Sequence, residues 1–352
     1  MTLSRRCRAE QALLDGTWVK LICGASNQDL LSIADLCALY ACAGVHCVDV
    51  AADPAVVRAA RQGLAWAKAR GADDVWLMVS ISDGRDAHFR KASFDPQRCP
   101  RDCPRPCQRV CPADAIAACP STTGVDASRC YGCGRCLPAC PLGLIAAHDH
   151  QQCRDDLGGL MATLAPDAVE VHTAPGRGEA FAHTIAALLD HQLPLRRLAV
   201  SCGLEGHGLT PSLLARELWQ RHAVLRTHAL RSLWQLDGRP MSGDVGRGTA
   251  RAAIQLWQHL RPMAPPGPLQ LAGGTNANTW RLLQDAPHPS GVYPAGVAFG
   301  GQARALVQPW LQQALERHQR LVDWPDGWSQ ALEQARALVD PWLQAQVGAA
   351  AC

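Results

Sequence analysis

Two cysteine runs occupy the middle of the chain, RCPRDCPRPCQRVCP at residues 98–112 and RCYGCGRCLPACP at residues 129–141. The second run spaces its cysteines as C-x2-C-x2-C-x3-C-P, which is typical of bacterial-type iron–sulfur ferredoxins. The first run has the spacing C-x3-C-x3-C-x3-C-P, one residue longer at each of its first two steps. The pair of runs predicts a small ferredoxin-like module that holds two clusters.

The ligands of each cluster follow from the way such loops wrap a cube. Three thiolates of one tight loop bind three irons, and the cysteine before the proline serves the other cluster. This rule predicts a first cluster held by Cys99, Cys103, Cys107 and Cys140, and a second cluster held by Cys111, Cys130, Cys133 and Cys136. We expect two [4Fe–4S] clusters. Because the first loop is long, its cluster could instead be [3Fe–4S], or Cys119 or Cys153 could serve as a ligand. Structural zinc prefers paired C-x2-C knuckles and fits the doubled run poorly.

Composition indicates a globular protein. The chain has 352 residues, of which 48% are hydrophobic and 18% charged, with a net charge of +3. These values argue against global disorder and give no reason to expect nucleic-acid binding. We expect no transmembrane segment, because no apolar run reaches 18 residues. A cytoplasmic protein with reduced thiols follows, in which clustered cysteines bind metal.

Short apolar segments alternate with helical ones on both sides of the cysteine runs. The sequence predicts strands at residues 17–26, 45–53, 74–82, 168–173, 195–203, 223–229, 268–274 and 296–301, with a long connection over residues 230–249. This alternation implies a parallel sheet, and eight units match a (β/α)8 TIM-type barrel. An open doubly wound sheet is the alternative, because counting strands does not show closure.

The predicted organisation has four parts. Residues 1–93 form the first part of the barrel, and residues 94–150 form the ferredoxin-like insert after the third strand. Residues 151–316 complete the barrel, and residues 317–352 form a C-terminal helical tail.

A ligand site at the barrel mouth is a second hypothesis. TIM barrels often bind phosphate in the loops after strands 7 and 8. Here the glycine pairs Gly273–Gly274 and Gly300–Gly301 lead into helices, where backbone amides could bind a phosphate or a flavin phosphate. Equally, the pairs could only make tight turns. We find no convincing catalytic set, because the segment 201–203 has no identifiable base and His172 and His228 stand alone at predicted strand ends.

Two further segments support a resemblance to a known family. They are QLDGRPMSGDVGRGTA at residues 235–250 and LQLAGGTNANT at residues 269–279. Together with the doubled cluster motif, they make the chain similar over nearly its whole length to the LdpA family, the light-dependent period proteins of cyanobacteria. The resemblance implies a redox-sensing input to the circadian clock that passes light-dependent information through iron–sulfur clusters to clock proteins.

Three functions remain open at this point. The favoured one is a redox sensor or electron carrier without enzymatic activity, whose partners are circadian clock input or oscillator proteins and a redox carrier. The rival is a ferredoxin-coupled oxidoreductase with a flavin or phosphorylated substrate at the barrel mouth. In the third, the clusters only stabilise the insert.

Overall fold

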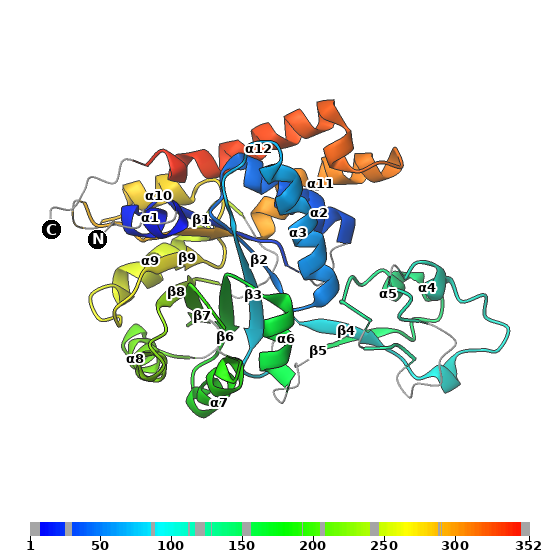
Figure 1. Ribbon diagram of the computed structural model, residues 1–352, viewed down its shortest axis with the longest axis horizontal. Coiled ribbons are helices and arrows are strands. Elements are labelled where there is room, and N and C mark those ends of the chain that lie inside the picture. The colour runs from blue at the N-terminus through cyan, green and yellow to red at the C-terminus, as the bar shows by residue number, and fades with distance from the viewer. Residues whose placement is uncertain are drawn as a thin grey trace.

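Eight parallel strands close into a barrel in the computed structural model of the chain (Figure 1). The structure describes residues 8–24, 30–85, 89–111, 113–116, 124–127, 129–149, 156–191, 193–204, 208–239, 246–287, 289 and 291–345. The barrel strands are β1 (Trp18–Ile22), β2 (Cys47–Ala51), β3 (Trp76–Ser82), β6 (Ala168–His172), β7 (Arg197–Gly203), β8 (Ser232–Asp237), β9 (Leu269–Ala272) and β10 (Gly296–Phe299). Since β1 pairs with both β2 and β10, the predicted barrel is confirmed and the open sheet is excluded.

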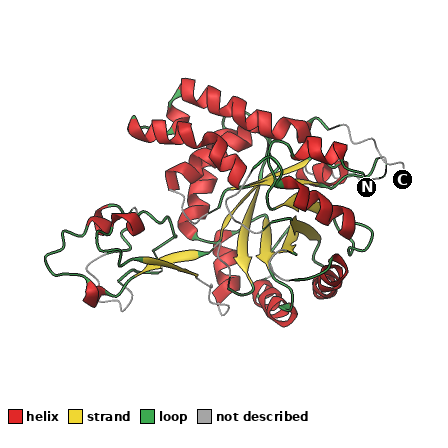
Figure 2. Cartoon of the chain, turned by 180° about the vertical axis from the view of Figure 1, so that it is seen from behind, coloured by secondary structure: helices red, strands yellow, loops and turns green. Residues whose placement is uncertain are grey.

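Helices cover the outside of the barrel (Figures 1 and 2). They are α2 (Leu30–Ala43), α3 (Pro54–Lys68), α6 (Leu157–Leu164), α7 (Gly178–Leu189), α8 (Pro211–Thr227), α9 (Ala250–Leu260), α10 (Thr279–Asp285) and α11 (Gly301–Glu316). The local sequence explains where some of these helices begin. At α3, the Asp53 carboxylate accepts hydrogen bonds from the amides of Ala55 and Val56, and Pro54 occupies the first turn.

The two ends of the chain pack on this frame. Helix α1 (Arg8–Asp15) closes the N-terminal end of the barrel, where Ala12 and Leu13 join the cluster that contains Trp18 and Trp76. The tail forms a 3-10 turn, η3 (Leu321–Asp323), and α12 (Pro325–Leu343), which packs on α2 and α11. Within the described residues, no helix has the length and apolar character needed to cross a membrane.

One predicted strand is wrong. Residues 223–229 lie in the last turns of α8 and just beyond it, and the barrel strand is β8, inside the stretch expected to be a long connection. A short apolar run does not distinguish a helix end from a strand. In α8, Leu218 and Leu225 are buried seven residues apart, which is a helical spacing. In β8, the first five residues are all buried. The polar Gln235 among them made this segment resemble a loop in the sequence.

The insert leaves the barrel after β3, as predicted, on a two-stranded stalk. Strands β4 (Arg90–Ser93) and β5 (Ala146–Asp149) pair antiparallel, with Arg90 opposite Asp149. Beyond them lie η1 (Pro96–Arg98) and the one-turn helices α4 (Pro106–Arg109) and α5 (Cys136–Ala139), set to one side of the barrel (Figure 1). The stalk was not predicted, because both strands are short and polar.

Candidate functional site: two groups of cysteines in the insert

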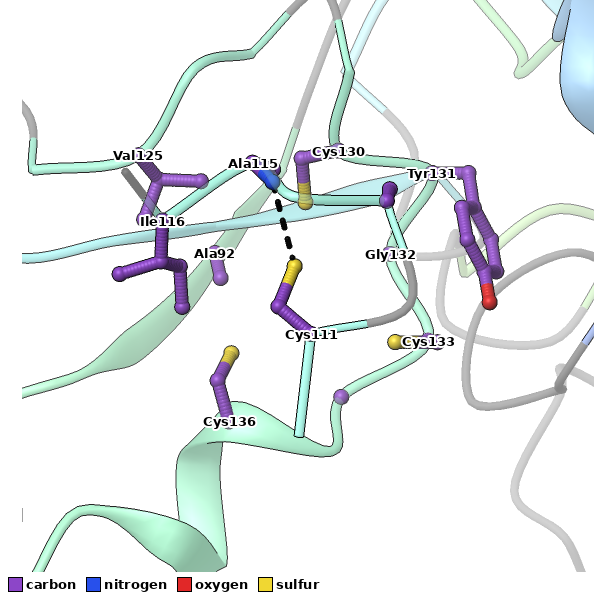
Figure 3. Close-up of a pocket in the computed structure, with 12 residues that line it drawn as sticks. Ala92, Cys111, Ala115, Ile116, Val125, Cys130, Tyr131, Gly132, Cys133 and Cys136 are labelled. Atoms are coloured by element: carbon purple, nitrogen blue, oxygen red, sulfur yellow. Dashed lines mark hydrogen bonds between the residues drawn. The ribbon is translucent and has the colours of Figure 1, made fainter. Parts of the chain in front are cut away.

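The structure brings the eight candidate ligands together as two separate groups of four. In the group predicted to hold the second cluster, Cys111 of the first run faces the thiols of the second run across one pocket (Figure 3). The other lining side chains are mainly apolar, among them Ala92, Ile116 and Val125. The lining residues from the second run are Cys130, Cys133 and Cys136. The crossing of Cys111 to the other run is the arrangement that the two-cluster rule predicts.

The group predicted to hold the first cluster gathers around Cys107. Burial raises the pKa of the Cys107 thiol, and the neighbouring Cys140 and Cys103 raise it further. Burial likewise raises the pKa of Cys99, with Cys103 beside it as the next cause. Cys140, which comes from the second run, therefore lies among the cysteines of the first. Cys119 and Cys153, the alternative ligands, fall outside the described residues.

The two Cys-Pro corners have equivalent geometry. The Ala115 amide donates to Cys111 Sγ at 3.3 Å, and the Leu144 amide donates to Cys140 Sγ at 3.4 Å. In both, the amide comes four residues after the cysteine, which supports a pseudo-two-fold repeat. Burial alone would raise the pKa of Cys140, but the amides of residues 142–145 together lower it. Such N–H···S bonds stabilise negative charge on sulfur, as an iron–sulfur cluster requires.

The loop of the second run needs glycine at two positions. Gly132 has φ +83° and Gly134 has φ +77°, a left-handed conformation that strains other residues. These turns let Cys130, Cys133 and Cys136 line the same pocket. The loop geometry therefore explains why the run alternates cysteine with glycine.

Burial raises the pKa of the Cys133 and Cys136 thiols and keeps these two protonated in the absence of iron. The pKa of Cys136 is raised to about 12, first by burial and then by the neighbouring thiols of Cys133, Cys130 and Cys111. Iron must therefore displace protons when it binds. The thiols line a pocket instead of converging on one point, and in the described ranges no three His, Cys, Asp or Glu side chains are placed to hold a single metal ion. Four sulfur donors, apolar cover and amides aimed at sulfur fit an iron–sulfur cluster.

A second polar constellation lies inside the barrel, and sequence reasoning missed it. Lys20 Nζ lies 3.0 Å from Asp49 Oδ2 and also contacts a Glu170 carboxylate oxygen. The other oxygen of Glu170 lies 3.1 Å from His172 Nε2 and accepts from Gln235 Nε2 at 2.9 Å. Barrel interiors are usually filled by branched apolar side chains. The signal available in the sequence was one polar residue in the centre of each of several apolar strands.

The buried positive and negative groups of this constellation stabilise each other's charged forms. Burial opposes the charge of Lys20, but Asp49 and Glu170 raise its pKa well above the usual range. Burial also opposes the charge of Glu170, yet Lys20 and then His172 lower its pKa to about 2. The centre of the barrel therefore holds ionised groups at neutral pH.

The structure shows what surrounds the single residues that the sequence suggested as candidates at strand ends. Ser201 Oγ donates to the Asp237 carboxylate and accepts from Gln235 Nε2 at 3.2 Å. His172 packs edge-on against Phe89, with ring centroids 5.5 Å apart, at the base of the insert. His228 is not at a strand end, because it caps the C-terminus of α8.

The glycine pairs differ in their surroundings. A Cβ on Gly273 would lie 2.5 Å from the Arg239 carbonyl oxygen, and one on Gly274 would lie 2.9 Å from that of Thr249. Close chain packing therefore explains this pair without a ligand. Gly300 and Gly301 begin α11 beside Arg304, whose Nη1 donates to the Ile22 carbonyl at 2.9 Å. The phosphate site stays a prediction.

Solved structures with similar topology are remote. The (S)-3-O-geranylgeranylglyceryl phosphate synthase of Thermoplasma acidophilum aligns with a TM-score of 0.43 and 10% identity, covering 96% of this chain and 99% of that chain. The YdjI aldolase of Escherichia coli aligns with a TM-score of 0.44 and 8% identity, covering 96% and 93%.

Sequence comparison gives a much stronger match. Residues 160–341 match the Light dependent period A C-terminal domain, and residues 99–151 match the LdpA Fe–S cluster-binding domain. The Light dependent period A protein of Synechococcus elongatus is 46% identical over 321 residues, which cover 90% of this chain and 88% of that protein. The chain therefore belongs to the LdpA family and contains that family's iron–sulfur cluster-binding domain.

Proposed function

We propose that this chain is a redox sensor that exchanges electrons at two [4Fe–4S] clusters and relays its oxidation state to a protein partner in the cytoplasm. The observation that carries the proposal is the separation of eight cysteines into two sulfur-rich groups on a stalk outside the barrel. Each electron taken up changes the charge of the insert by one unit. A partner that binds the two charge states with different affinities would convert that change into a signal.

The charge of the insert suits an acidic redox carrier. The arginines exposed around the cysteine runs are Arg98, Arg101, Arg109 and Arg129. The exposed acidic residues of the same stretch are Asp95, Asp102 and Asp114, so the excess of positive charge is small. An acidic protein that docks on the arginines would associate faster at low salt. We infer that an acidic electron carrier delivers electrons here.

The second partner follows from the family. The relative from Synechococcus elongatus is named for a light-dependent period, and this chain shares nearly half of its aligned residues with it. We propose circadian clock input or oscillator proteins as the receivers of the signal. In this role the chain is not an enzyme.

Two measurements, made one after the other, test the proposal. Anaerobically purified protein should contain iron and sulfide and should give reversible one-electron steps in a potentiometric titration followed by electron paramagnetic resonance. The oxidised and reduced forms should then bind purified clock proteins of the same organism with different affinities. Equal affinities, with a protein that cycles reversibly, would refute the sensor.

A ferredoxin-coupled oxidoreductase is the second candidate, and the polar interior of the barrel favours it. Lys20, Glu170 and His172 connect the barrel centre to the end of β6, and active sites of TIM barrels lie at that end of the strands. A flavin or phosphorylated substrate would bind near Gly300 and Arg304. A flavin spectrum in the purified protein, or substrate turnover with a reduced carrier, would support this candidate over the sensor.

A further inference from the structure

The chain leaves the barrel for the insert at a tightly held point, the root (residues 83–85). Asp83 follows β3 directly, and its amide donates to the His172 carbonyl at 3.1 Å, which extends the pairing of β3 with β6 beyond both strands. The Asp83 side chain is fully buried. Its carboxylate accepts from the Thr173 hydroxyl and lies 3.3 Å from Arg177 Nη1. Because a buried carboxylate is costly unless it is paired, these two contacts stabilise the root.

Arg177 binds three consecutive residues of the root. Besides its ion pair with Asp83, its Nη2 donates to the Arg85 carbonyl at 3.0 Å. Gly84 lies between them, and a Cβ there would come within 2.7 Å of Arg177 Nη1 and 2.9 Å of its Cζ. The backbone of Gly84 is not left-handed, so glycine serves here to let the guanidinium approach closely. The planar fork of arginine donates in two fixed directions at once, which a lysine ammonium does not reproduce.

A second arginine fixes the barrel side of this contact. Arg221 of α8 is 1% exposed, and its Nη2 donates to the Ala174 carbonyl at 2.9 Å and to Thr173 Oγ1 at 3.4 Å. Its Nη1 pairs with Glu217, whose carboxylate accepts from the Gly176 amide at 3.2 Å. Helix α8 therefore holds the segment that follows β6, and the root is attached to a fixed base.

The cysteine groups lie at the far end of a thin support. Beyond the root, the insert projects from the barrel on the two strands of its stalk (Figure 2). Its far end returns to the barrel where Tyr131 packs in the barrel's hydrophobic cluster. A cleft of about 250 Å³ separates the loop of Cys133 and Arg135 from helices α2 and α11. A two-stranded ribbon has little stability of its own, so a change of angle at the root would move the clusters relative to the barrel.

We propose that Asp83 and Arg177 form a clamp that sets the orientation of the insert, so that a partner bound to the barrel meets the clusters at one distance. Both are positioning residues. Coulomb energy depends on distance, and averaging over many orientations would reduce the difference in partner affinity between the two oxidation states. The orientation follows from the contacts alone, whereas its effect on the signal rests on the proposed function.

Two variants loosen the clamp without removing its charges. Arg177→Lys keeps a cation beside Asp83 but loses the fork that also binds Arg85. Gly84→Ala places a methyl group where the guanidinium lies and should displace it. Each variant acts on a different partner of the same contact, so the test does not depend on one of them folding. In both, we expect the insert to sample a wider range of positions.

The measurement is a distance between the barrel and the insert. Nitroxides attached to p-acetylphenylalanine at Gln62 of α3 and Gln97 of η1, both exposed, are compared by double electron–electron resonance in oxidised, iron-loaded protein. The labelling chemistry avoids the cysteines. We expect a narrow distance distribution without a further substitution and a severalfold broader one in Arg177→Lys and Gly84→Ala. A narrow distribution in both variants overturns the inference.

Matched controls lie away from the root. Arg196 Nε is 3.1 Å from Asp167 Oδ1, and the same carboxylate accepts from the Leu77 amide at 3.0 Å, so this pair joins β3 and β6 at their opposite ends. Arg196→Lys makes the same chemical change there. A Cβ on Gly248 would meet nothing within 4 Å, so Gly248→Ala is the control for the added methyl. Both controls should keep the narrow distribution, and equal broadening in them would overturn the inference.

A second measurement separates this inference from the proposed function. Iron content and reduction potentials of Arg177→Lys should equal those of the wild type, while the ratio of its affinities for purified clock proteins in the two oxidation states should move severalfold toward one. If the wild type already binds equally in both states, the proposed function fails and the distance measurement alone decides the clamp. If Arg177→Lys broadens the distribution but distinguishes the states as well as the wild type, the clamp has no part in the signal and the inference is overturned.

Discussion

The crossing of Cys111 and Cys140 between the two runs can be tested by counting iron. Substitution of Cys130 and Cys133 by alanine removes two of the four ligands of the second cluster, so this background should retain only the first. The protein should then contain about four irons instead of about eight. Each further substitution reports on the cluster that remains.

In this background, the crossed arrangement of the structure and an arrangement in which each run holds its own cluster predict opposite results. Cys111 belongs to the first run, yet it lines the pocket of the second group. Cys140 belongs to the second run, yet it lies beside Cys107. Adding Cys111→Ala should therefore leave the iron content at about four, whereas adding Cys140→Ala should reduce it to about three or less, because the remaining cube loses a ligand.

The assay is iron and sulfide determination on anaerobically reconstituted protein, with electron paramagnetic resonance to distinguish a [3Fe–4S] product from complete loss. The two variants are matched, since each removes one thiol from a Cys-Pro corner that receives an amide hydrogen bond. If Cys111→Ala lowers the iron content and Cys140→Ala does not, each run holds its own cluster and the crossed arrangement is refuted.

Two further predictions concern the barrel. Lys20→Met leaves Asp49 and Glu170 buried without their cation and should lower the free energy of unfolding by about 3–5 kcal/mol, with part of the loss recovered on adding Glu170→Gln. Removal of Lys68, which is exposed, should change the free energy of unfolding far less in the same urea titration, because solvent screens its ion pair, and an equal loss for both lysines would contradict the reasoning. Burial, followed by the charge of Arg8, lowers the pKa of His46 to about 3. The unfolded chain therefore binds a proton that the folded chain does not, and stability should fall between pH 6.5 and 3 by up to about 1.4 kcal/mol per pH unit. His46→Asn should flatten this dependence in iron-free protein, and an unchanged slope would exclude His46 as its source.

The barrel could be predicted wherever its strands are apolar and its helices have clear starts. Strands near Val48, Val79 and Val200 follow that pattern, and the Asp53-Pro54 pair marks the start of α3. The strand containing Gln235 was not predicted, because in a sequence a polar residue that points into the barrel looks like a loop residue. The grouping of the cysteines was accessible because cluster ligands obey a spacing rule that does not depend on the rest of the fold.

Long-range contacts account for what the sequence did not predict. The ion pair of Lys20 with Glu170 joins strands separated by 150 residues, and a single chain shows no sign of which polar residues will meet. Tyr131, between Cys130 and Cys133, packs in the hydrophobic cluster of the barrel, and this contact depends on how the insert docks. The short stalk strands have too few apolar residues for a periodic signal.

The stalk also has a consequence for how such a protein can be altered. Because Arg90 and Asp149 stand opposite each other, the metal-binding unit leaves and rejoins its host at neighbouring points. Lengthening, shortening or exchanging that unit requires no rearrangement of the host, much as a hairpin loop tolerates insertions. The architecture allows one scaffold to accept different redox modules at the same junction.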